Sequence, residues 1–330
     1  MTFSQKVYKR KMRENLVMKR NIVVKKIGII GSGVVGSATG KGFHKLGHDV
    51  LFYDISKQRL HDLKDDGYKV ASSVSEIMEK TDLSFVCVNT PTKNDGEQDL
   101  SQLMSVLYDI ANALGTINRK QQQEGEGEER KQRNPHLIVF RSTMLPGTMR
   151  NVVINYLQSN CASSKIGKDY NVCYNPEFLR QNTALEDFFK PDRVIIGEND
   201  NGASEPLREI YQQLTDNIIV TSPEAAEMIK YTSNCFLSLK ISFFNEIGLV
   251  CKQMGIDDKA VSLGVSMDKR IGQYGTQFGK PFEGACLPKD TEALAGFIRK
   301  LELNPDLLQV ALDINRKMEE LISSKSPCVR

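Results

Sequence analysis

The sequence predicts a doubly wound, mainly parallel α/β fold, followed by an all-helical central domain with one long connecting helix. A glycine-rich turn ends the first apolar run, within residues 26–36. Short apolar runs then alternate with helix-like segments up to residue 222, the pattern of a parallel sheet covered by helices. Over 224–255 apolar positions recur at helical spacing without a proline, which indicates a helix longer than is usual in globular proteins.

Composition limits the class of protein. The chain has 330 residues, 40% apolar and 26% charged, enough for two globular domains with cores. Its apolar runs are far shorter than the roughly 20 residues that a bilayer span requires, so we expect no membrane-spanning helix and no membrane partner. Seven cysteines are scattered without CxxC pairs or histidines at metal spacing. This pattern indicates reduced thiols, a cytoplasmic location and no metal site.

The formal net charge of +3 is concentrated near the N-terminus. Residues 1–26 carry nine Lys or Arg against one acid, Glu14, and the remainder has 35 basic and 40 acidic residues. This mildly acidic remainder gives no argument for nucleic-acid binding. Residues 1–25 lack the apolar core of a secretory signal, and we expect a basic, disordered extension there.

Residues 26–36 read as a buried strand that enters a helix through three glycines, the dinucleotide-binding fingerprint of a Rossmann fold. Gly31 makes the tight turn, Gly33 lets a pyrophosphate approach the backbone, and Gly36 permits close packing of helix and strand. A glycine-rich turn without a ligand is the alternative. The first helical residues, whose N–H groups would face the phosphates, are Val34 and Val35.

The next strand, residues 49–53, ends at Asp54. A carboxylate about 20 residues after the glycines suits the 2′-hydroxyl of a ribose and repels a 2′-phosphate, which favours NAD over NADP. Lys57, which follows shortly after, is a further candidate for cofactor binding.

Two later strands end in loops that carry threonines. The strand at 83–88 follows a short helix and opens into Asn89-Thr-Pro-Thr, and the strand at 136–141 opens into Ser142-Thr-Met-Leu-Pro-Gly. Parallel sheets bind ligands beyond the carboxyl ends of their strands, so Thr90 and Thr143 are candidate cofactor contacts. Ordinary polar turn residues are the alternative.

Between these strands we expect a helix over 100–114 and a disordered surface insertion over 119–134. Residues 119–133 have no apolar side chain and cannot pack against a core.

The strand at 170–174 follows a helix over 148–158 and leads into Asn175-Pro-Glu-Phe-Leu. Glu177 comes directly after a proline at a strand end, which suits a positioned carboxylate, with a solvated loop acid as the alternative. Strands at 193–197 and 218–221 complete this half of the chain.

In the long helix, Lys230 and Asn234 lie four residues apart and therefore share a face. An ammonium and an amide placed in this way can both reach into a cleft, although most such pairs are surface neighbours. A helix of this length commonly connects domains or forms an oligomer interface.

Late in the chain, a cysteine stands between a glycine-containing turn and a Pro-Lys-Asp sequence. Gly284 leaves room for a ligand and Pro288 stiffens the exit, so Cys286 is a candidate nucleophile at an accessible point. Lys289 can favour the thiolate, and Asp290 can handle protons. A small buried cysteine is the alternative. Helices over 291–301 and 306–322 follow.

Seven motifs occur in one order along the chain: Gly31-x-Gly33-x-x-Gly36, Asn89-Thr-Pro-Thr, Ser142-Thr-x-x-Pro-Gly-Thr, Asn175-Pro-Glu-Phe-Leu, Lys230-x-x-x-Asn234, Arg270-Ile-Gly and Gly284-Ala-Cys-Leu-Pro-Lys-Asp290. Together they resemble the UDP-glucose/GDP-mannose dehydrogenase family over about residues 26–320. The Asn-Thr-Pro-Thr and Asn-Pro-Glu-Phe-Leu segments and the Arg-Ile-Gly run are most similar to the UDP-glucose branch. The Leu before Pro288 also resembles the GDP-mannose branch, so the substrate stays open.

The resemblance implies an NAD-binding Rossmann domain over 26–222 and a central helical domain for dimerisation and catalysis over 223–325. The family ordinarily continues into a UDP-binding domain, and this sequence ends at residue 330 before one, so a fragment of a longer protein and a natural short form are both open. A homodimer through the central helices is implied as well.

The resemblance also implies a reaction, the oxidation of a sugar-nucleotide C6 alcohol to a carboxylate with two NAD. By this resemblance, the thiol of Cys286 attacks the intermediate aldehyde. The second oxidation then gives a thioester, which is hydrolysed. By resemblance, the catalytic positions are Cys286, Lys230, Asp290, Glu177, Asn234 and Thr143. The implied cofactor contacts add Lys289 to those already named. The implied substrate contacts are Glu177, Phe178, Leu179, Arg180, Lys230, Asn234, Arg270 and Gly284.

Three departures from the family pattern keep other functions open. Gln181 stands where relatives usually have a second carboxylate, Glu283 stands where a glycine is common and would disfavour the Cys286 thiolate, and the third domain is missing. A truncated, non-catalytic NAD-binding homologue is therefore an alternative. A two-domain hydroxyacid dehydrogenase, which would not need Cys286, is another.

Overall fold

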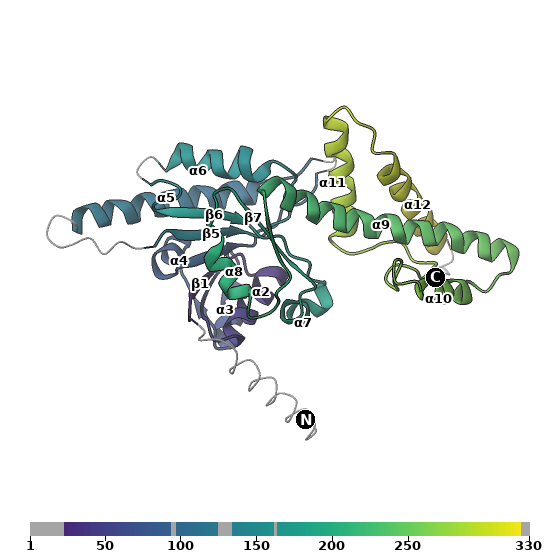
Figure 1. Ribbon diagram of the computed structural model, residues 1–330, viewed down its shortest axis with the longest axis horizontal. Helices are drawn as coiled ribbons and strands as arrows, with labels where there is room; N and C mark the ends of the chain where they lie inside the picture. The colour runs from purple at the N-terminus through teal and green to yellow at the C-terminus, as the bar shows by residue number, and fades with distance from the viewer. Residues whose placement is uncertain (1–22, 94–96, 125–133, 162–163, 325–330) are drawn as a thin grey trace, which may run out of the picture. The chain divides into compact units, whose positions relative to one another are not determined.

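The computed structural model describes residues 23–93, 97–124, 134–161 and 164–324 (Figure 1). The chain divides into two compact units. The first unit comprises Met1–Val88, Met104–Ser142 and Met149–Ala226, and the second comprises Asn89–Leu103, Thr143–Thr148 and Glu227–Arg330. Two loops that follow strands and carry Thr90 and Thr143 therefore belong to the helical unit. In sequence, however, both loops lie within the Rossmann domain. Most of the expected N-terminal extension, residues 1–22, lies outside the described residues.

The first unit is built on one eight-stranded sheet in the order β3-β2-β1-β4-β5-β6-β7-β8 (Figure 1). Every neighbouring pair is parallel except β6 and β7. This is the Rossmann strand order, and the predicted fold class is confirmed. The strands are β1 (Lys26–Ile30), β2 (Asp49–Tyr53), β3 (Lys69–Val70), β4 (Leu83–Val86), β5 (His136–Phe140), β6 (Tyr170–Tyr174), β7 (Val194–Glu198) and β8 (Ile218–Thr221).

The register of the sheet brings the ends of five strands to one edge. The final residues Tyr53, Ile30, Val86, Phe140 and Tyr174 are paired in succession across β2, β1, β4, β5 and β6. The residues that come next in each strand therefore gather at the carboxyl edge, where folds of this kind bind ligands.

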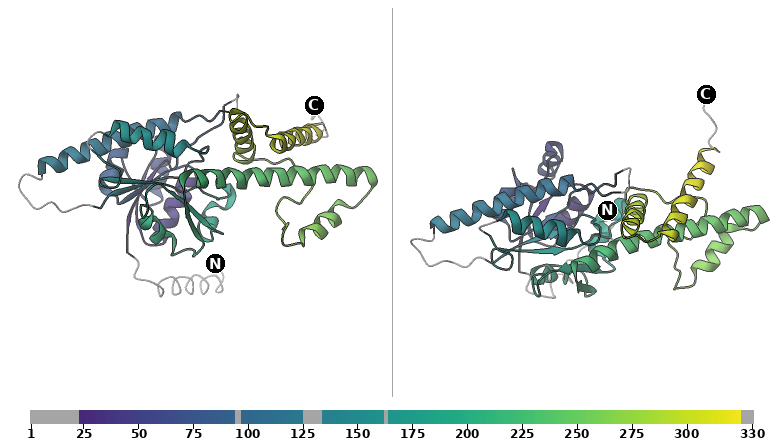
Figure 2. Two further views of the ribbon diagram at one scale, coloured as in Figure 1. Left: turned by 45° about the horizontal axis from the view of Figure 1, so that its top comes forward. Right: turned by 90° about the horizontal axis from the view of Figure 1, so that it is seen from above.

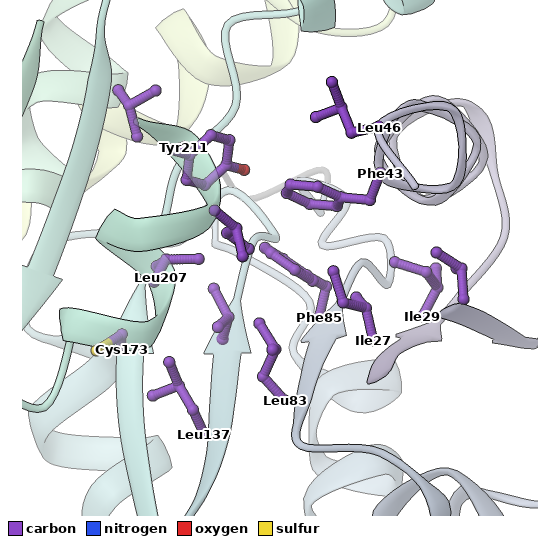
Figure 3. Packing of buried hydrophobic residues seen from close by; sticks show 14 of the residues in the cluster. Ile27, Ile29, Phe43, Leu46, Leu83, Phe85, Leu137, Cys173, Leu207 and Tyr211 are labelled. Carbon is purple, nitrogen blue, oxygen red and sulfur yellow. The ribbon is translucent and has the colours of Figure 1, made fainter. Parts of the chain in front are cut away.

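Helices cover both faces of this sheet. They are α2 (Val34–Lys45), α3 (Lys57–Asp65), α4 (Val74–Lys80), α5 (Ser101–Glu124), the π-helical η1 (Met149–Ile154), α6 (Asn155–Asn160), the short 3₁₀ turn η2 (Gln181–Thr183), α7 (Ala184–Phe189) and α8 (Glu205–Tyr211). Helices α5 and α6 run side by side on one face (Figures 1 and 2). Helices α2 and α8 pack on the other face, around the cluster shown in Figure 3.

Aromatic rings from α2, β4 and α8 pack against one another in that cluster. The Phe43 ring of α2 stacks on Phe85 of β4 at 5.4 Å between centroids and meets Tyr211 of α8 edge-on at 5.5 Å (Figure 3). Phe43 is fully buried, and removing such a ring typically costs about 3–5 kcal/mol of stability. This packing holds the C-terminal part of α2 against the sheet.

One helix runs further than the sequence indicated. Helix α5 continues to Glu124, beyond the expected end at residue 114, so the assignment of residues 119–124 to a disordered insertion is wrong. Once a helix is nucleated, each further residue adds one backbone hydrogen bond, so a packed helix can continue into a polar segment. Residues 125–133 of the expected insertion lie outside the described residues.

The second unit is helical. Its helices are α9 (Pro223–Met254), whose first turn belongs to the first unit, α10 (Asp258–Ser266), α11 (Leu287–Lys300) and α12 (Asp306–Ser323). Tyr231 and Cys235 of α9 form its core with Ala293, Leu294 and Ala295 of α11 and Leu308 of α12. Helix α11 begins at Leu287, earlier than the expected residue 291, because Pro288 occupies its first turn, where a proline is tolerated.

Helix α9 is long and apolar enough to cross a membrane by length and composition alone. The core helices of soluble proteins pass the same test. In this unit α9 buries polar side chains that bind loops: Asn245 accepts the Gly279 N–H at 2.9 Å and donates to the Lys280 carbonyl at 2.7 Å. The buried Asn245 amide is thus satisfied within the unit.

Candidate active site

The glycine turn of the first unit fits the role expected of each glycine. Gly31 has φ +91°, and a Cβ there would lie 2.7 Å from the Cys87 carbonyl oxygen. A Cβ at Gly36 would lie 1.9 Å from the Gly31 oxygen. At Gly33 a Cβ would meet no described atom within 4 Å. Gly31 is therefore required by the close backbone of Cys87 and Gly36 by the close approach of α2 to the turn, whereas Gly33 faces open space beside the backbone.

Asp54 lies beside this turn, at the end of β2. Its carboxylate is 5% exposed and accepts the N–H groups of Ser32 at 2.6 Å and Ser56 at 2.8 Å. The Arg59 guanidinium approaches it at 3.4 Å, a neighbour that the sequence analysis missed. Lys57 and Val34 are exposed in the first turns of α3 and α2, and Val35 is half-buried.

These residues fit a dinucleotide. No side chain caps the N-terminus of α2 and no acid lies in its first turn, so its N–H groups are open to an anion. Gly33 leaves room for that anion, and Asp54 places an acceptor at the neighbouring strand end. Among the described residues no cluster of three or more His, Cys, Asp or Glu side chains forms a metal site.

Glu177 belongs to the first unit and follows β6. It is 6% exposed, and its Oε2 accepts the Leu179 N–H at 2.6 Å. The structure therefore holds it as a buried carboxylate, and the alternative of a solvated loop acid is wrong. Phe178 and Arg180 are fixed as well, since Arg193 stacks 3.9 Å over the Phe178 ring and Arg180 pairs with Asp187.

A buried arginine stabilises the start of this loop. Arg141, at the end of β5, donates to the Asn175 carbonyl at 3.3 Å, to Asn175 Oδ1, and to Tyr211 Oη at 3.0 Å. Burial raises the pKa of the neighbouring Cys87 thiol to about 12, with the Arg141 charge acting downward and the Glu177 charge upward. A single arginine in a strand carries no pattern that the sequence analysis could have detected.

The second unit gathers a cluster around Asp290, in the first turn of α11. This carboxylate is 1% exposed. Asn234 Nδ2 of α9 donates to its Oδ2 at 2.6 Å, and Lys289 Nζ lies 2.5 Å from its Oδ1. Lys230 precedes Asn234 by about one helical turn and is 3% exposed. The structure thus brings the amide and the carboxylate together and buries the lysine in the same helix.

Cys286 directly precedes α11, and its carbonyl accepts the Asp290 N–H at 2.9 Å. Its side chain is exposed, as is Gly284. The alternative of a small buried cysteine is therefore wrong. Cys235 of the same unit is buried, and burial raises the pKa of its thiol to about 12.

Thr143 and Thr90 meet in the second unit. The Thr143 carbonyl accepts the Thr90 hydroxyl at 2.5 Å and the Gln98 amide at 2.8 Å. Gln98 was not singled out from the sequence, because a lone glutamine in a loop has no recognisable spacing. Arg270 lies in the loop after α10, is exposed, and binds Asp268. Its described hydrogen bonds go to that neighbour and not to the Asp290 cluster.

Two family models describe most of the chain. Residues 63–215 match the UDP-glucose/GDP-mannose dehydrogenase family NAD binding domain, and residues 224–317 match the central domain of that family. Residues 1–103 also match the NAD binding domain of the D-isomer specific 2-hydroxyacid dehydrogenases. This third match concerns an NAD binding domain alone.

Curated relatives cover nearly the whole chain. A GDP-mannose 6-dehydrogenase of Pseudomonas syringae pv. tomato is 36% identical over 313 residues, which are 88% of this chain and 68% of the relative. A UDP-glucose 6-dehydrogenase of Rickettsia bellii is 35% identical over 322 residues, 91% of this chain and 68% of the relative.

A solved UDP-glucose dehydrogenase from Pyrobaculum islandicum has the same fold. It superposes with a TM-score of 0.80 at 32% identity, over 92% of this chain and 70% of the other.

Proposed function

The chain belongs to the UDP-glucose/GDP-mannose dehydrogenase family of NAD-dependent sugar-nucleotide dehydrogenases, and from this premise we propose that it oxidises UDP-glucose to UDP-glucuronate. The observation that carries the proposal is the buried Asp290–Asn234 pair one helical turn from the exposed Cys286. A hydroxyacid dehydrogenase has no use for this combination.

The first unit would hold the cofactor. The N–H groups at Gly33, Val34 and Val35 would bind the pyrophosphate, and Asp54 would accept from the adenosine ribose. Thr90, Thr143 and Lys289 are proposed as its further contacts. Two NAD molecules, bound in turn at this site, would each accept one hydride.

In the first oxidation the hydroxyl group loses its proton and the C6 carbon transfers a hydride, which leaves an aldehyde at C6. Asp290 is the proposed proton acceptor, acting through water, because its carboxylate is buried and held by two donors. Lys230 is proposed to stabilise the alkoxide as the proton departs.

In the second oxidation the Cys286 thiolate forms a bond to the aldehyde carbon. Lys230 and Asn234 donate to the oxygen that gains negative charge, and removal of one such donor typically costs about 3–4 kcal/mol of barrier. The thiohemiacetal then loses a second hydride and a proton, which leaves a thioester on Cys286.

Hydrolysis of the thioester completes the reaction. Water adds to the acyl carbon, the carbon–sulfur bond breaks, and the thiol and the sugar carboxylate are released. Glu177 is the proposed base for this water and Thr143 its proposed orienting partner. The proposed substrate contacts are those that the resemblance supplies: Glu177, Phe178, Leu179, Arg180, Lys230, Asn234, Arg270 and Gly284.

GDP-mannose is a second candidate substrate. Relatives named for the two substrates are almost equally similar, at 36% and 35% identity. Leu287, which directly precedes Pro288 in the cysteine motif, also matches the GDP-mannose branch.

We further propose a cytoplasmic homodimer through α9. Phe236, Phe243 and Val250 are exposed and seven residues apart, so they form one apolar stripe along the helix. An exposed stripe of this kind is typical of a helix that packs against a second copy.

The experiment that tests the activity measures NADH formation by absorbance. Purified protein receives NAD with UDP-glucose, GDP-mannose, UDP-N-acetylmannosamine or no sugar. We expect two NADH per UDP-glucose, and we expect Cys286→Ser to lose that stoichiometry while the control Cys161→Ser, a buried cysteine of the first unit, retains it. NAD binding without turnover of any sugar would contradict the proposed activity for this chain.

A further inference from the structure

One glutamine side chain joins two segments of the second unit. Gln98 Nε2 donates to the Thr143 carbonyl at 2.8 Å and to the Tyr231 hydroxyl of α9 at 3.1 Å. Its Oε1 accepts the Leu145 N–H at 3.2 Å. The one amide thus contacts both ends of a three-residue stretch and connects that stretch to the core helix.

The Thr143 carbonyl is saturated by these contacts. Its second donor is the Thr90 hydroxyl, at 2.5 Å. A carbonyl oxygen has two lone pairs, so two donors fix the orientation of the Thr143 peptide. Further along, the Gly147 N–H donates to Glu227 of α9 at 2.6 Å, which holds the far end of the same segment.

Gln98 is itself held in place by its backbone. It forms an antiparallel bridge with Thr92, beside a hydrogen bond of 2.8 Å from the Asp99 N–H to the Pro91 carbonyl. The Thr92 hydroxyl donates to the Lys289 carbonyl in the first turn of α11, at 3.2 Å. The paired residues Thr92 and Gln98 therefore contact the two segments that carry Thr143 and Asp290.

We propose that Gln98 is a positioning residue that fixes the Thr143 peptide relative to α9 and α11. Its amide holds Thr143 where the threonine orients water for hydrolysis of the acyl group on Cys286. The catalytic part of this inference rests on the proposed function. The ordering of residues 143–145 rests on the hydrogen bonds alone, and the two parts have separate tests.

Hydrogen–deuterium exchange of the full chain tests the ordering. In Gln98→Ala the Leu145 N–H loses its acceptor, and we expect its exchange to rise about tenfold, as loss of one protecting hydrogen bond allows. The matched control is Gln102→Ala, which removes another amide from the same segment, where Oε1 accepts the Asn89 N–H at 3.3 Å. Unchanged exchange at Leu145 in Gln98→Ala overturns the proposal.

Gln98→Glu distinguishes the donor role of the amide from its acceptor role. It also provides a test if Gln98→Ala does not fold. Its carboxylate still accepts the Leu145 N–H but places an oxygen against the Thr143 carbonyl. We expect protection of Leu145 to persist while kcat falls about tenfold. A kcat equal to that of the unsubstituted chain overturns the positioning role.

The intact mass of the protein during turnover identifies the affected step. Slow hydrolysis predicts that Gln98→Glu accumulates chain acylated at Cys286, whereas a general loss of structure lowers all steps together. If the unsubstituted chain oxidises no sugar nucleotide, the proposed function fails, and with it the catalytic role of Gln98. The exchange experiment then still decides whether Gln98 orders the Thr143 segment.

Discussion

Cys235 and Cys286 have the same side chain but differ in burial. Cys235 lies beneath Asp290 with its thiol directed to that residue's carbonyl, at 3.6 Å, and burial raises its pKa to about 12. Cys286 lies on the exposed side of the same helical turn. Sequence spacing alone left a nucleophile and a buried structural cysteine equally open, because it carries no information on which side of the turn the thiol points.

His48 gives a prediction of pH dependence at the same scale. It is 3% exposed, and burial together with the nearby Lys25 charge lowers its pKa from 6.5 to about 4. The neutral ring is favoured in the folded state: Nδ1 accepts the Lys25 N–H at 3.2 Å, and with the Gln213 amide turned, Nε2–H can donate to Gln213 Oε1. As the pH falls, the His48 ring is therefore protonated at a higher pH in the unfolded chain than in the folded one.

This contribution to stability is complete above pH 6.5, declines between pH 6.5 and 4, and is constant below. We expect a loss of at most about 3 kcal/mol across that window, measured as the urea midpoint at pH 7.5 and 4.5. His48→Asn removes the contribution, so its midpoint changes less with pH than that of the exposed control His61→Asn. An equal pH dependence of the two variants contradicts the prediction.

At the scale of elements, strands were predictable, whereas the end of α5 and the start of α11 were not. The strands at 49–53, 170–174 and 218–221 have the bounds that the sequence indicated, because a strand in a parallel sheet reads as a short apolar run between polar turns. The start of α11 was missed because Pro288 was read as an exit from a turn. A proline also suits the first turn of a helix, and only the packing of that turn distinguishes the two.

The turn between β1 and α2 yields a prediction that separates folding from binding. In Gly36→Ala the new Cβ would overlap the Gly31 carbonyl, so we expect a loss of about 3 kcal/mol or more, or failure to fold. Gly33→Ala meets open space, so we expect a melting temperature within about 2 °C of the unsubstituted chain and at least tenfold weaker NAD binding, because the methyl group occupies the approach of the pyrophosphate.

Thermal melting and calorimetric titration with NAD measure the two effects. Normal NAD affinity in Gly33→Ala would mean that the cofactor does not approach this turn, and it would remove the main support for the proposed cofactor contacts. A stable Gly36→Ala variant would contradict the close packing of β1 and α2.

At the scale of the whole molecule, the family could be recognised from motif order, but the arrangement of loops could not. Residues 89–103 and 143–148 group with the helical unit, although each follows a strand of the sheet. Their contacts arise from Gln98, Thr92 and Thr90, single polar residues whose partners lie far away in the sequence. Such pairings depend on the folded backbone and leave no periodic signal.

Assembly is the remaining property at this scale. The stripe of Phe236, Phe243 and Val250 leaves three large apolar side chains between 48% and 63% exposed on one helix face. Burial of such side chains against a second copy is favourable by about 25 cal/mol per Å² of apolar surface. We therefore expect a dimer at micromolar concentration.

Two substitutions to Glu test whether this stripe is the dimer interface. They are made at two side chains of similar exposure. Phe243→Glu places a carboxylate at the centre of the stripe, and two copies would face each other across a twofold axis, so we expect a monomer by light scattering coupled to size exclusion. Tyr108→Glu alters a side chain on α5 that is 60% exposed, close to the 55% of Phe243, and should leave the mass unchanged. A dimer that survives Phe243→Glu would place the interface elsewhere, because two carboxylates that face each other across the twofold axis repel.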